Sequence, residues 1–187
     1  MTARPARYRV RPGRAEDAPL LGAVERAAAR RFAGIGLAAI ADGRPTSEAE
    51  YREAAVKGHL WVVELGEGKD GRPGPVVGLA LADKLDGEGF LAELSVHPDH
   101  AGQRLSVRLI DAVEAWAATQ GCRSLRLTTF RDVPWNRPYY ERLGFAPLDE
   151  AEAGAELRAV RDRERARGVD AHGPRVCMIR TIGRKPV

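Results

Sequence analysis

The hydrophobic positions along the chain follow two spacings, one typical of amphipathic helices and one typical of strands. Helical spacing predicts three helices, over 14–32, 46–58 and 103–120. The apolar positions of the first are Leu20, Leu21, Val24 and Ala28, and those of the second are Tyr51, Ala55 and Val56. The apolar positions of the third are Leu105, Leu109, Val113, Trp116 and Ala117. Ser47 and Glu50 are spaced as a capping box, while Gly58 and Gly121 are expected to end their helices.

Seven runs have the pattern of strands, at 8–11, 59–65, 75–85, 89–96, 122–130, 145–148 and 175–182. Segments dense in turn residues separate the second, third and fourth runs, which predicts an antiparallel meander. A short helix is expected over 134–144, with Asn136 as its N-cap and Pro138 in its first turn. The polar segment 150–168 is predicted to be helical, with a thin apolar stripe of Leu157 and Val160.

The composition is that of a globular protein. The 187 residues are 44% hydrophobic, enough to bury one core, so we expect a single domain over 1–187. No apolar run approaches the length of a membrane span, and the basic N-terminus lacks the apolar core of a secretory signal, which predicts a cytoplasmic protein with no membrane partner. Cys122 and Cys177 have no CxxC motif or neighbouring histidine, so neither a disulfide framework nor a metal site is expected.

The net charge of +4 arises from 30 basic and 26 acidic residues that are spread along the chain. The sequence contains no basic run interleaved with aromatic residues, and nucleic acid is therefore not expected as a partner. The small excess of positive charge is compatible with a polyanionic small molecule. The arginine-rich segment 158–167 is interpreted as a solvated helix face.

The stretch VHPDHAGQRLSVRL, residues 96–109, passes from a strand into a helix through a short turn. A strand that ends at Val96 and a helix that begins near Gln103 would present unpaired main-chain N–H groups and the positive end of a helix dipole to one point. This arrangement favours a bound phosphate, and an ordinary strand-to-helix turn is the alternative. His97 and His100 have no third metal ligand nearby and are interpreted as exposed turn residues.

The order of the predicted elements and three sequence blocks resemble the GNAT (N-acetyltransferase) superfamily. RVRPGRAEDAPLL is similar to the opening of these proteins, AELSVHPDHAGQRLSVRLI resembles their acetyl-CoA loop, and NRPYYERLGFAPL resembles their Tyr-x-x-x-Gly-Phe block. The resemblance extends over most of the chain. It implies an α+β (α/β) fold with a mixed central sheet of about seven strands, flanked by helices and splayed at the coenzyme A site.

By this resemblance acetyl-CoA is the acyl donor, and no metal takes part. The residues implied to bind the donor are Leu94, Ser95 and Val96 along the pantetheine arm, Ala101, Gly102, Gln103, Arg104, Leu105 and Ser106 around the pyrophosphate, and Asn136. The family's loop pattern is altered here, because Ala101, Arg104 and Ser106 stand at its signature positions and only Gly102 is retained. We expect Arg104 to have helical dihedral angles and to direct its guanidinium along the phosphates. For Asn136, N-capping is the alternative role.

Attack of an amine on the acetyl thioester requires two proton transfers. Tyr140 matches the family's tyrosine near the leaving thiol and is predicted to protonate the sulfur, its alternative being a core aromatic residue beside Tyr139. Glu93 shares a strand face with Ser95 by alternation and is predicted to accept the amine proton, directly or through water. The alternative for Glu93 is a sheet carboxylate paired with an arginine.

The sequence therefore predicts an acetyl-CoA-dependent N-acetyltransferase that transfers the acetyl group directly to a primary amine of a small molecule. Candidate acceptors are aminosugars such as aminoglycoside antibiotics, amino acids and polyamines, and Glu93, Asp83 or Asp86 would face a cationic acceptor. The apolar, glycine-rich loop 33–45 is expected to line the pocket. The alternative function is a non-catalytic acyl-CoA-binding regulatory module, motivated by the altered loop, and a homodimer is compatible with either function.

Overall fold

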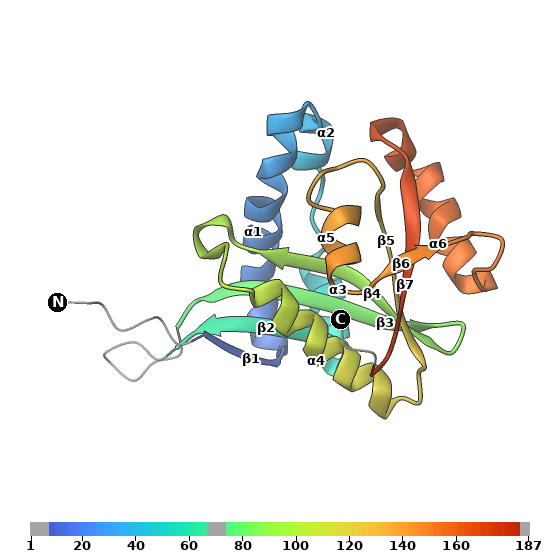
Figure 1. The fold of residues 1–187 in the computed structure, drawn as a ribbon. Helices are drawn as coiled ribbons and strands as arrows, with labels where there is room; N and C mark the ends of the chain where they lie inside the picture. Colours follow the sequence, from blue (N-terminus) through green and yellow to red (C-terminus); the bar gives the residue numbers. More distant parts are fainter. Residues whose placement is uncertain (1–7, 67–73, 184–187) are drawn as a thin grey trace. The chain divides into compact units, whose positions relative to one another are not determined.

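The computed structural model describes residues 8–66 and 74–183, and these residues fall into two compact units. The first unit contains the residues up to 81 together with 93–112, and the second contains 82–92 together with the residues from 113 onward. The strands of the described residues form a sheet in the order β1-β2-β3-β4-β5-β7-β6 (Figure 1). They are β1 (Tyr8–Pro12), β2 (Leu60–Leu65), β3 (Val76–Leu85), β4 (Glu88–Val96), β5 (Ser124–Phe130), β6 (Ala146–Leu148) and β7 (Arg175–Thr181).

Helices separate several of these strands along the chain. The helices within the described residues are α1 (Ala18–Ala29), α2 (Ala38–Ala41), α3 (Glu48–Lys57), α4 (Leu105–Thr119), α5 (Arg137–Arg142) and α6 (Ala155–Ala166), with the 3₁₀ helices η1 (Ala15–Asp17), η2 (Arg30–Ile35), η3 (Pro98–His100) and η4 (Val169–His172). The sheet is mixed, because β4 and β5 pair in parallel while β1 with β2, β2 with β3, and β7 with β5 and β6 are antiparallel. The predicted α+β fold with a seven-stranded mixed sheet and flanking helices is confirmed, and the splay at the cofactor site stays a prediction.

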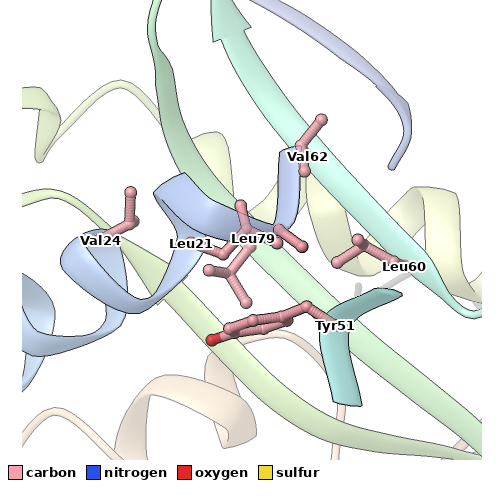
Figure 2. Close-up of a cluster of buried hydrophobic side chains, with 7 residues drawn as sticks. Leu21, Val24, Tyr51, Leu60, Val62 and Leu79 are labelled. Carbon is pink, nitrogen blue, oxygen red and sulfur yellow. The ribbon is translucent and has the colours of Figure 1, made fainter. Parts of the chain in front are cut away.

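In the first unit, α1 and α3 contact β2 and β3 through one cluster of buried side chains. The members of this cluster are Ala18, Leu21, Val24, Tyr51, Leu60, Val62 and Leu79. Figure 2 shows the Tyr51 ring beside Leu21 and Leu79, with its hydroxyl directed away from Leu60. Removal of these side chains from water is the main force that holds both helices on the strands.

Helix α1 buries every third residue, at Ala18, Leu21, Val24 and Ala27. Leu20 was expected on this buried face, but its side chain is 54% exposed. The reason is geometric, because buried residues three apart make the buried stripe shift around the helix by about 60° at each step. Near the start of the helix Leu20 points about 160° away from Ala18 and about 100° away from Leu21, and so lies on the solvent side. The helix is therefore confirmed, and the assignment of Leu20 to its buried face is wrong.

Helix α3 begins and ends as the sequence predicts. The Glu50 N–H donates to the Ser47 hydroxyl oxygen at 3.3 Å and the Ser47 N–H donates to the Glu50 carboxylate at 2.8 Å, which completes the capping box. Gly58 ends the helix in the left-handed conformation, with φ of +73°. Val56 was expected beside Tyr51 but is 82% exposed, because five residues turn a helix by about 140° from its starting face.

Helix α4 begins at Leu105, two residues later than the sequence predicts. The predicted apolar stripe is confirmed, since Leu105, Leu109, Val113 and Ala117 are all buried. Gly121 follows the helix with φ of +74°, as expected of a residue that ends it. Across residues 8–66 and 74–183, no helix combines the length and the apolar character needed to cross a membrane.

The loop 33–45 contains more regular structure than the sequence indicates. It includes the end of η2, a left-handed Gly36 with φ of +81°, and the single turn of α2. Ile35 in this segment is 42% exposed. The expected role of the loop as a pocket lining stays a prediction.

In the second unit, α6 packs on β4 and β7 through a cluster of Phe90, Ala153, Leu157 and Cys177. Strand β7 pairs with β5 from Ser124↔Thr181 to Phe130↔Arg175 and carries β6 on its other edge. The predicted burial of Leu157 is therefore confirmed. The apolar face of the otherwise polar helix α6 is thus buried against this cluster.

The interpretation of 158–167 as a solvated helix face is wrong at Arg161, which is only 1% exposed. Its guanidinium contacts three carboxylates, with Nε donating to Glu150 at 3.0 Å, a terminal nitrogen donating to Asp170 at 2.8 Å, and a further bond to Glu164. Arg161 lies four residues after the buried Leu157 and so shares its face of the helix. A buried cation persists there because carboxylates neutralise its charge.

Asp86 has a structural role that differs from the acceptor-facing role weighed from the sequence. Its two carboxylate oxygens accept the main-chain N–H groups of Glu156 and Leu157, each at 3.0 Å, and so cap the N-terminus of α6. A Cβ added at Gly154 would lie 2.0 Å from the Asp86 carboxyl carbon, so the close approach requires glycine. These hydrogen bonds occupy the carboxylate that was expected to face an acceptor.

Candidate active site

Strand β4 places Glu93 and Ser95 on one face, as strand alternation predicts. The hydroxyl of the buried Ser95 donates to Glu93 Oε1 at 2.7 Å, and this bond fixes the position of the carboxylate. Leu94 and Val96, expected to hold the pantetheine arm through their main chain, are half-buried on the same strand. The first unit thus brings together Glu93 and the three predicted β4 contacts.

The charge of Glu93 acts on the Tyr51 phenol, and no pattern in the sequence predicts this interaction. Burial, a hydrogen bond to the Glu25 carboxylate and the negative charge of Glu93 together raise the pKa of the Tyr51 phenol. The phenol therefore stays protonated at neutral pH and donates its proton in the hydrogen bond to the Glu25 carboxylate. In the sequence, Tyr51 has the spacing of an ordinary core residue of a helix, which is why its link to Glu93 escapes prediction.

The turn after β4 departs from helical geometry at Arg104. The His97 N–H donates to the Val77 carbonyl at 2.8 Å, which continues the main-chain pairing past the end of β4. Gly102 then has φ of +77° and Arg104 has φ of +54°. The expectation of helical dihedral angles at Arg104 is wrong, because this residue lies one position before α4 in the left-handed conformation that glycine adopts most easily.

Main-chain N–H groups at this turn are available to a ligand. Those of Gly102, Arg104 and Leu105 donate to no acceptor within the described residues, and the first helical bond runs from the Arg108 N–H to the Arg104 carbonyl at 3.2 Å. Residues 101–104 are exposed, and so are the side chains of Arg104 and Arg108. These donors lie at the positive end of a fifteen-residue helix, in an exposed turn that includes Arg104, and this combination fits an anion such as a diphosphate.

Replacement of Arg104 by glycine is expected to stabilise the protein by about 0.5–1 kcal/mol, because glycine relieves the left-handed strain but has more freedom in the unfolded chain. Arg104→Val is expected to destabilise it, since a β-branched residue tolerates positive φ least. Urea denaturation of the three proteins measures both changes. Equal stability of the glycine and valine variants would contradict the left-handed conformation at this position.

Tyr140 and Asn136 belong to the second unit, in and just before α5. The Tyr140 ring makes edge contacts with the rings of Tyr139 and Phe145, at centroid distances of 5.4 and 5.6 Å. Asn136 is the N-cap residue of α5 and Pro138 lies in the first turn, as predicted, but the Asn136 side chain makes no capping hydrogen bond. Its main-chain carbonyl accepts instead, from the Tyr139 N–H at 2.9 Å and the Tyr140 N–H at 3.1 Å. The Asn136 amide is thus not engaged in capping.

His97 and His100 are more engaged than exposed turn residues would be. Both are half-buried, and their rings make an edge contact at a centroid distance of 6.0 Å. His97 Nδ1 accepts the Asp99 N–H at 3.3 Å, and His100 Nδ1 lies 3.0 Å from the Tyr8 hydroxyl oxygen. In the part of the chain that the structure describes, no cluster of three or more His, Cys, Asp or Glu side chains has the arrangement of a metal site.

The chain resembles one protein family in sequence and many solved structures in fold. A model of the acetyltransferase (GNAT) family matches residues 24–145. PaiA N-acetyltransferase from Thermoplasma acidophilum, solved with coenzyme A, is similar with a TM-score of 0.65 and 15% identity, over 94% of this chain and 99% of that chain. The ribosomal-protein-S18-alanine N-acetyltransferase of Escherichia coli is similar with a TM-score of 0.61 and 15% identity, over 95% and 96% of the two chains.

A third similar structure belongs to a longer chain. N-acetylglutamate synthase from Neisseria gonorrhoeae, solved with coenzyme A and N-acetyl-glutamate, has a TM-score of 0.67 and 19% identity over 97% of this chain but 37% of that chain. At these identities the solved structures establish the fold, and the family match, which covers more than half of the chain including β4, the turn and the start of α4, establishes membership. The chain belongs to the GNAT family and is an N-acetyltransferase that uses acetyl-CoA.

Proposed function

We propose that the protein transfers the acetyl group of acetyl-CoA directly to a primary amine of a small molecule. The observation that carries this proposal is the set of main-chain donors at Gly102, Arg104 and Leu105, which have no acceptor within the described residues and meet the N-terminus of α4 in an exposed, basic turn. Three donors and a helix dipole suit the diphosphate of coenzyme A. In this proposal the altered loop still binds the diphosphate through its main-chain N–H groups, although the family's signature side chains have been replaced.

The cofactor contacts follow from this placement. In the proposal, the main chain of 101–106 holds the diphosphate, with Arg104 as an added cation, and the main chain of Leu94 and Val96 on β4 holds the pantetheine arm. Asn136 contributes its side-chain amide, which capping does not use. The roles of Leu94, Val96 and Asn136 rest on the family resemblance.

The chemistry requires that a nitrogen–carbon bond forms, the carbon–sulfur bond breaks, the amine loses a proton and the thiolate gains one. We assign the first proton to Glu93, whose carboxylate is held by the Ser95 hydroxyl, and the second to Tyr140. Direct transfer is favoured over an acyl-enzyme because burial raises the pKa of the Cys177 thiol to about 11 and also raises the pKa of Cys122. Neither thiol is therefore an effective nucleophile at neutral pH.

The acceptor is the least constrained part of the proposal. The similar structures include an N-acetylglutamate synthase and a ribosomal-protein-alanine N-acetyltransferase, and these names point to different acceptors. Neither name refers to an aminosugar, and the aminoglycoside hypothesis receives no support from them. The proposal keeps the broader class of small primary amines.

Thiol release from acetyl-CoA tests the proposal, measured with amino acids, polyamines, aminosugars and short peptides as acceptors. We expect release that depends on one class of small amine, together with a rise in melting temperature on addition of coenzyme A. Release with peptides alone would overturn the small-molecule acceptor. Stabilisation by coenzyme A without release for any acceptor would favour the acyl-CoA-binding regulatory module instead.

Three further expectations from the sequence stay predictions. They are a single domain over 1–187, a cytoplasmic location and a homodimer. Light scattering at micromolar concentration decides the oligomeric state. Partial proteolysis tests the domain organisation, since a single domain is expected to leave no smaller fragment that stays folded on its own.

A further inference from the structure

Tyr8, the first residue of β1, contacts both sides of the turn that we propose as the diphosphate site. Its position on the sheet is fixed, because Tyr8 pairs with Leu65 in the antiparallel register of β1 and β2. All residues of this arrangement belong to the first unit. The pairing of β1 with β2 therefore fixes the position of Tyr8 and of the groups that bond to it.

On the N-terminal side of the turn, Tyr8 holds His100. The Tyr8 hydroxyl oxygen lies 3.0 Å from His100 Nδ1, and the two rings meet edge to face at a centroid distance of 5.7 Å and an interplanar angle of 86°. His100 Nδ1 accepts a hydrogen bond from the phenol when the nitrogen carries no proton and donates one to the phenol oxygen when it does, so either tautomer can make the bond. His100 is in turn fixed to the turn itself, since its N–H donates to the His97 carbonyl at 3.0 Å.

On the C-terminal side, Tyr8 holds the first turn of α4. A terminal nitrogen of Arg108 donates to the Tyr8 carbonyl oxygen at 3.1 Å. Arg108 is also the first residue whose N–H makes a helical bond, to the Arg104 carbonyl. One residue of the sheet thus ties down the chain just before Ala101 and just after Ser106.

We infer that Tyr8, through His100 and Arg108, is a positioning residue that fixes the diphosphate turn 101–106 for coenzyme A. This inference rests on the proposed function. The turn has few internal constraints of its own, because its N–H groups at Gly102, Arg104 and Leu105 make no bond within the described residues. If the turn is already ordered before binding, less conformational entropy of the turn is lost when the ligand binds, and the affinity is higher.

Loss of the Tyr8 contacts is expected to change KM for acetyl-CoA but not kcat. Loss of the support frees the turn without touching the acetyl group, so affinity for acetyl-CoA falls while the rate at saturation stays the same. A role in stability alone would lower the melting temperature and leave the Michaelis constant unchanged. A role in chemistry would lower kcat.

The test compares Tyr8→Phe, which removes only the hydroxyl, with the wild-type protein in the thiol-release assay and in calorimetric titration with coenzyme A. We expect KM for acetyl-CoA and Kd for coenzyme A to rise about fivefold, the effect of one net hydrogen bond, with kcat unchanged. The matched control is Arg9→Met on the same strand, which removes a cation whose side chain is 70% exposed and which is paired with Glu64 at 3.7 Å. This control is expected to leave KM unchanged.

A second pair of variants provides rescue and protects the test against misfolding of Tyr8→Phe. His100→Leu removes the nitrogen that meets the phenol and is expected to raise KM as Tyr8→Phe does. His100→Asn places an amide oxygen near the same point and is expected to restore KM. The double variant of Tyr8→Phe with His100→Leu should be no worse than either single variant, because both remove one shared bond.

The inference is overturned if KM is unchanged in Tyr8→Phe and His100→Leu, or if His100→Asn is as impaired as His100→Leu. In that case wild-type binding and turnover remain intact, and the proposed function stands without the support from Tyr8. Failure of the wild-type protein to bind coenzyme A overturns both the inference and the proposed function. The wild-type titration therefore distinguishes the two failures.

Discussion

Replacement of Tyr140 by phenylalanine is expected to lower kcat by about 10²–10⁴-fold, the usual effect of removing a general acid. The phenylalanine ring retains the edge contacts with Tyr139 and Phe145, so the fold should be unchanged. Without the hydroxyl, the departing sulfur must take its proton from water. Steady-state kinetics with saturating acetyl-CoA and amine measure the loss.

Tyr139→Phe is the matched control for this prediction. Tyr139 lies next to Tyr140 on α5 and contacts both Tyr140 and the Arg142 guanidinium, which lies 5.9 Å from its ring centre. Its hydroxyl has no assigned role, and turnover is expected to be retained. If Tyr140→Phe turns over as fast as the wild-type protein across the pH range, the assignment of the acid is wrong. If both variants lose turnover equally, the effect arises from packing of α5.

Replacement of Arg161 by alanine is expected to lower the free energy of unfolding by about 1–3 kcal/mol, because it removes the buried cation that bonds to three partly buried carboxylates. The loss is limited because Glu150 keeps its ion pair with Arg165 and Glu164 keeps its ion pair with Arg175. The guanidinium is 1% exposed and bonds to Glu150, Glu164 and Asp170. Arg163→Ala, on the exposed side of the same helix, is the control and is expected to change stability by less than about 0.5 kcal/mol. Urea denaturation of the three proteins at pH 7 provides the comparison. Equal effects of the two substitutions would refute the structural role of Arg161.

The effect of Arg161→Ala should depend on pH. The hydrogen bond from Arg161 lowers the pKa of Asp170, and for Glu164 the nearby Arg175 and several hydrogen bonds outweigh burial and lower its pKa also. Carboxylates with a lowered pKa in the folded state stabilise the protein above their unfolded pKa of about 4, and this contribution is lost as the pH falls through the folded value. The difference between wild-type and Arg161→Ala proteins should therefore shrink below about pH 4. A difference that stays constant from pH 7 to pH 3 would contradict this origin.

Much of the fold is predictable from local signals in the sequence. Alternation and helical spacing locate the seven strands found in residues 8–66 and 74–183 and the longer helices there, because burial of one face imposes those periods on the chain. The capping pair Ser47 and Glu50 and the stop at Gly58 act within a few residues of each other, and they fix the ends of α3 as expected. Errors at Leu20 and Val56 concern which apolar residues face inward, and this depends on the partner surface.

The parts of the site that escape prediction depend on contacts between distant residues. Arg161 lies in a run of charges typical of a solvated face, and only the folded chain shows that residues 150 and 170 supply its carboxylates. Tyr8 and His100 are 92 residues apart, and no local pattern in the sequence predicts that their side chains are in contact. The sequence shows that arginine stands in place of a glycine at 104, but the left-handed backbone appears only in the structure.

Hydrogen exchange of the amides of 101–106 tests whether the main chain of this turn holds the diphosphate. The exchange is measured for the free protein, with coenzyme A, and with pantetheine, which lacks the diphosphate. We expect coenzyme A to slow exchange at Gly102, Arg104 and Leu105, whereas pantetheine should leave it unchanged. Binding of coenzyme A with unchanged exchange at these three amides would contradict this role of the main chain.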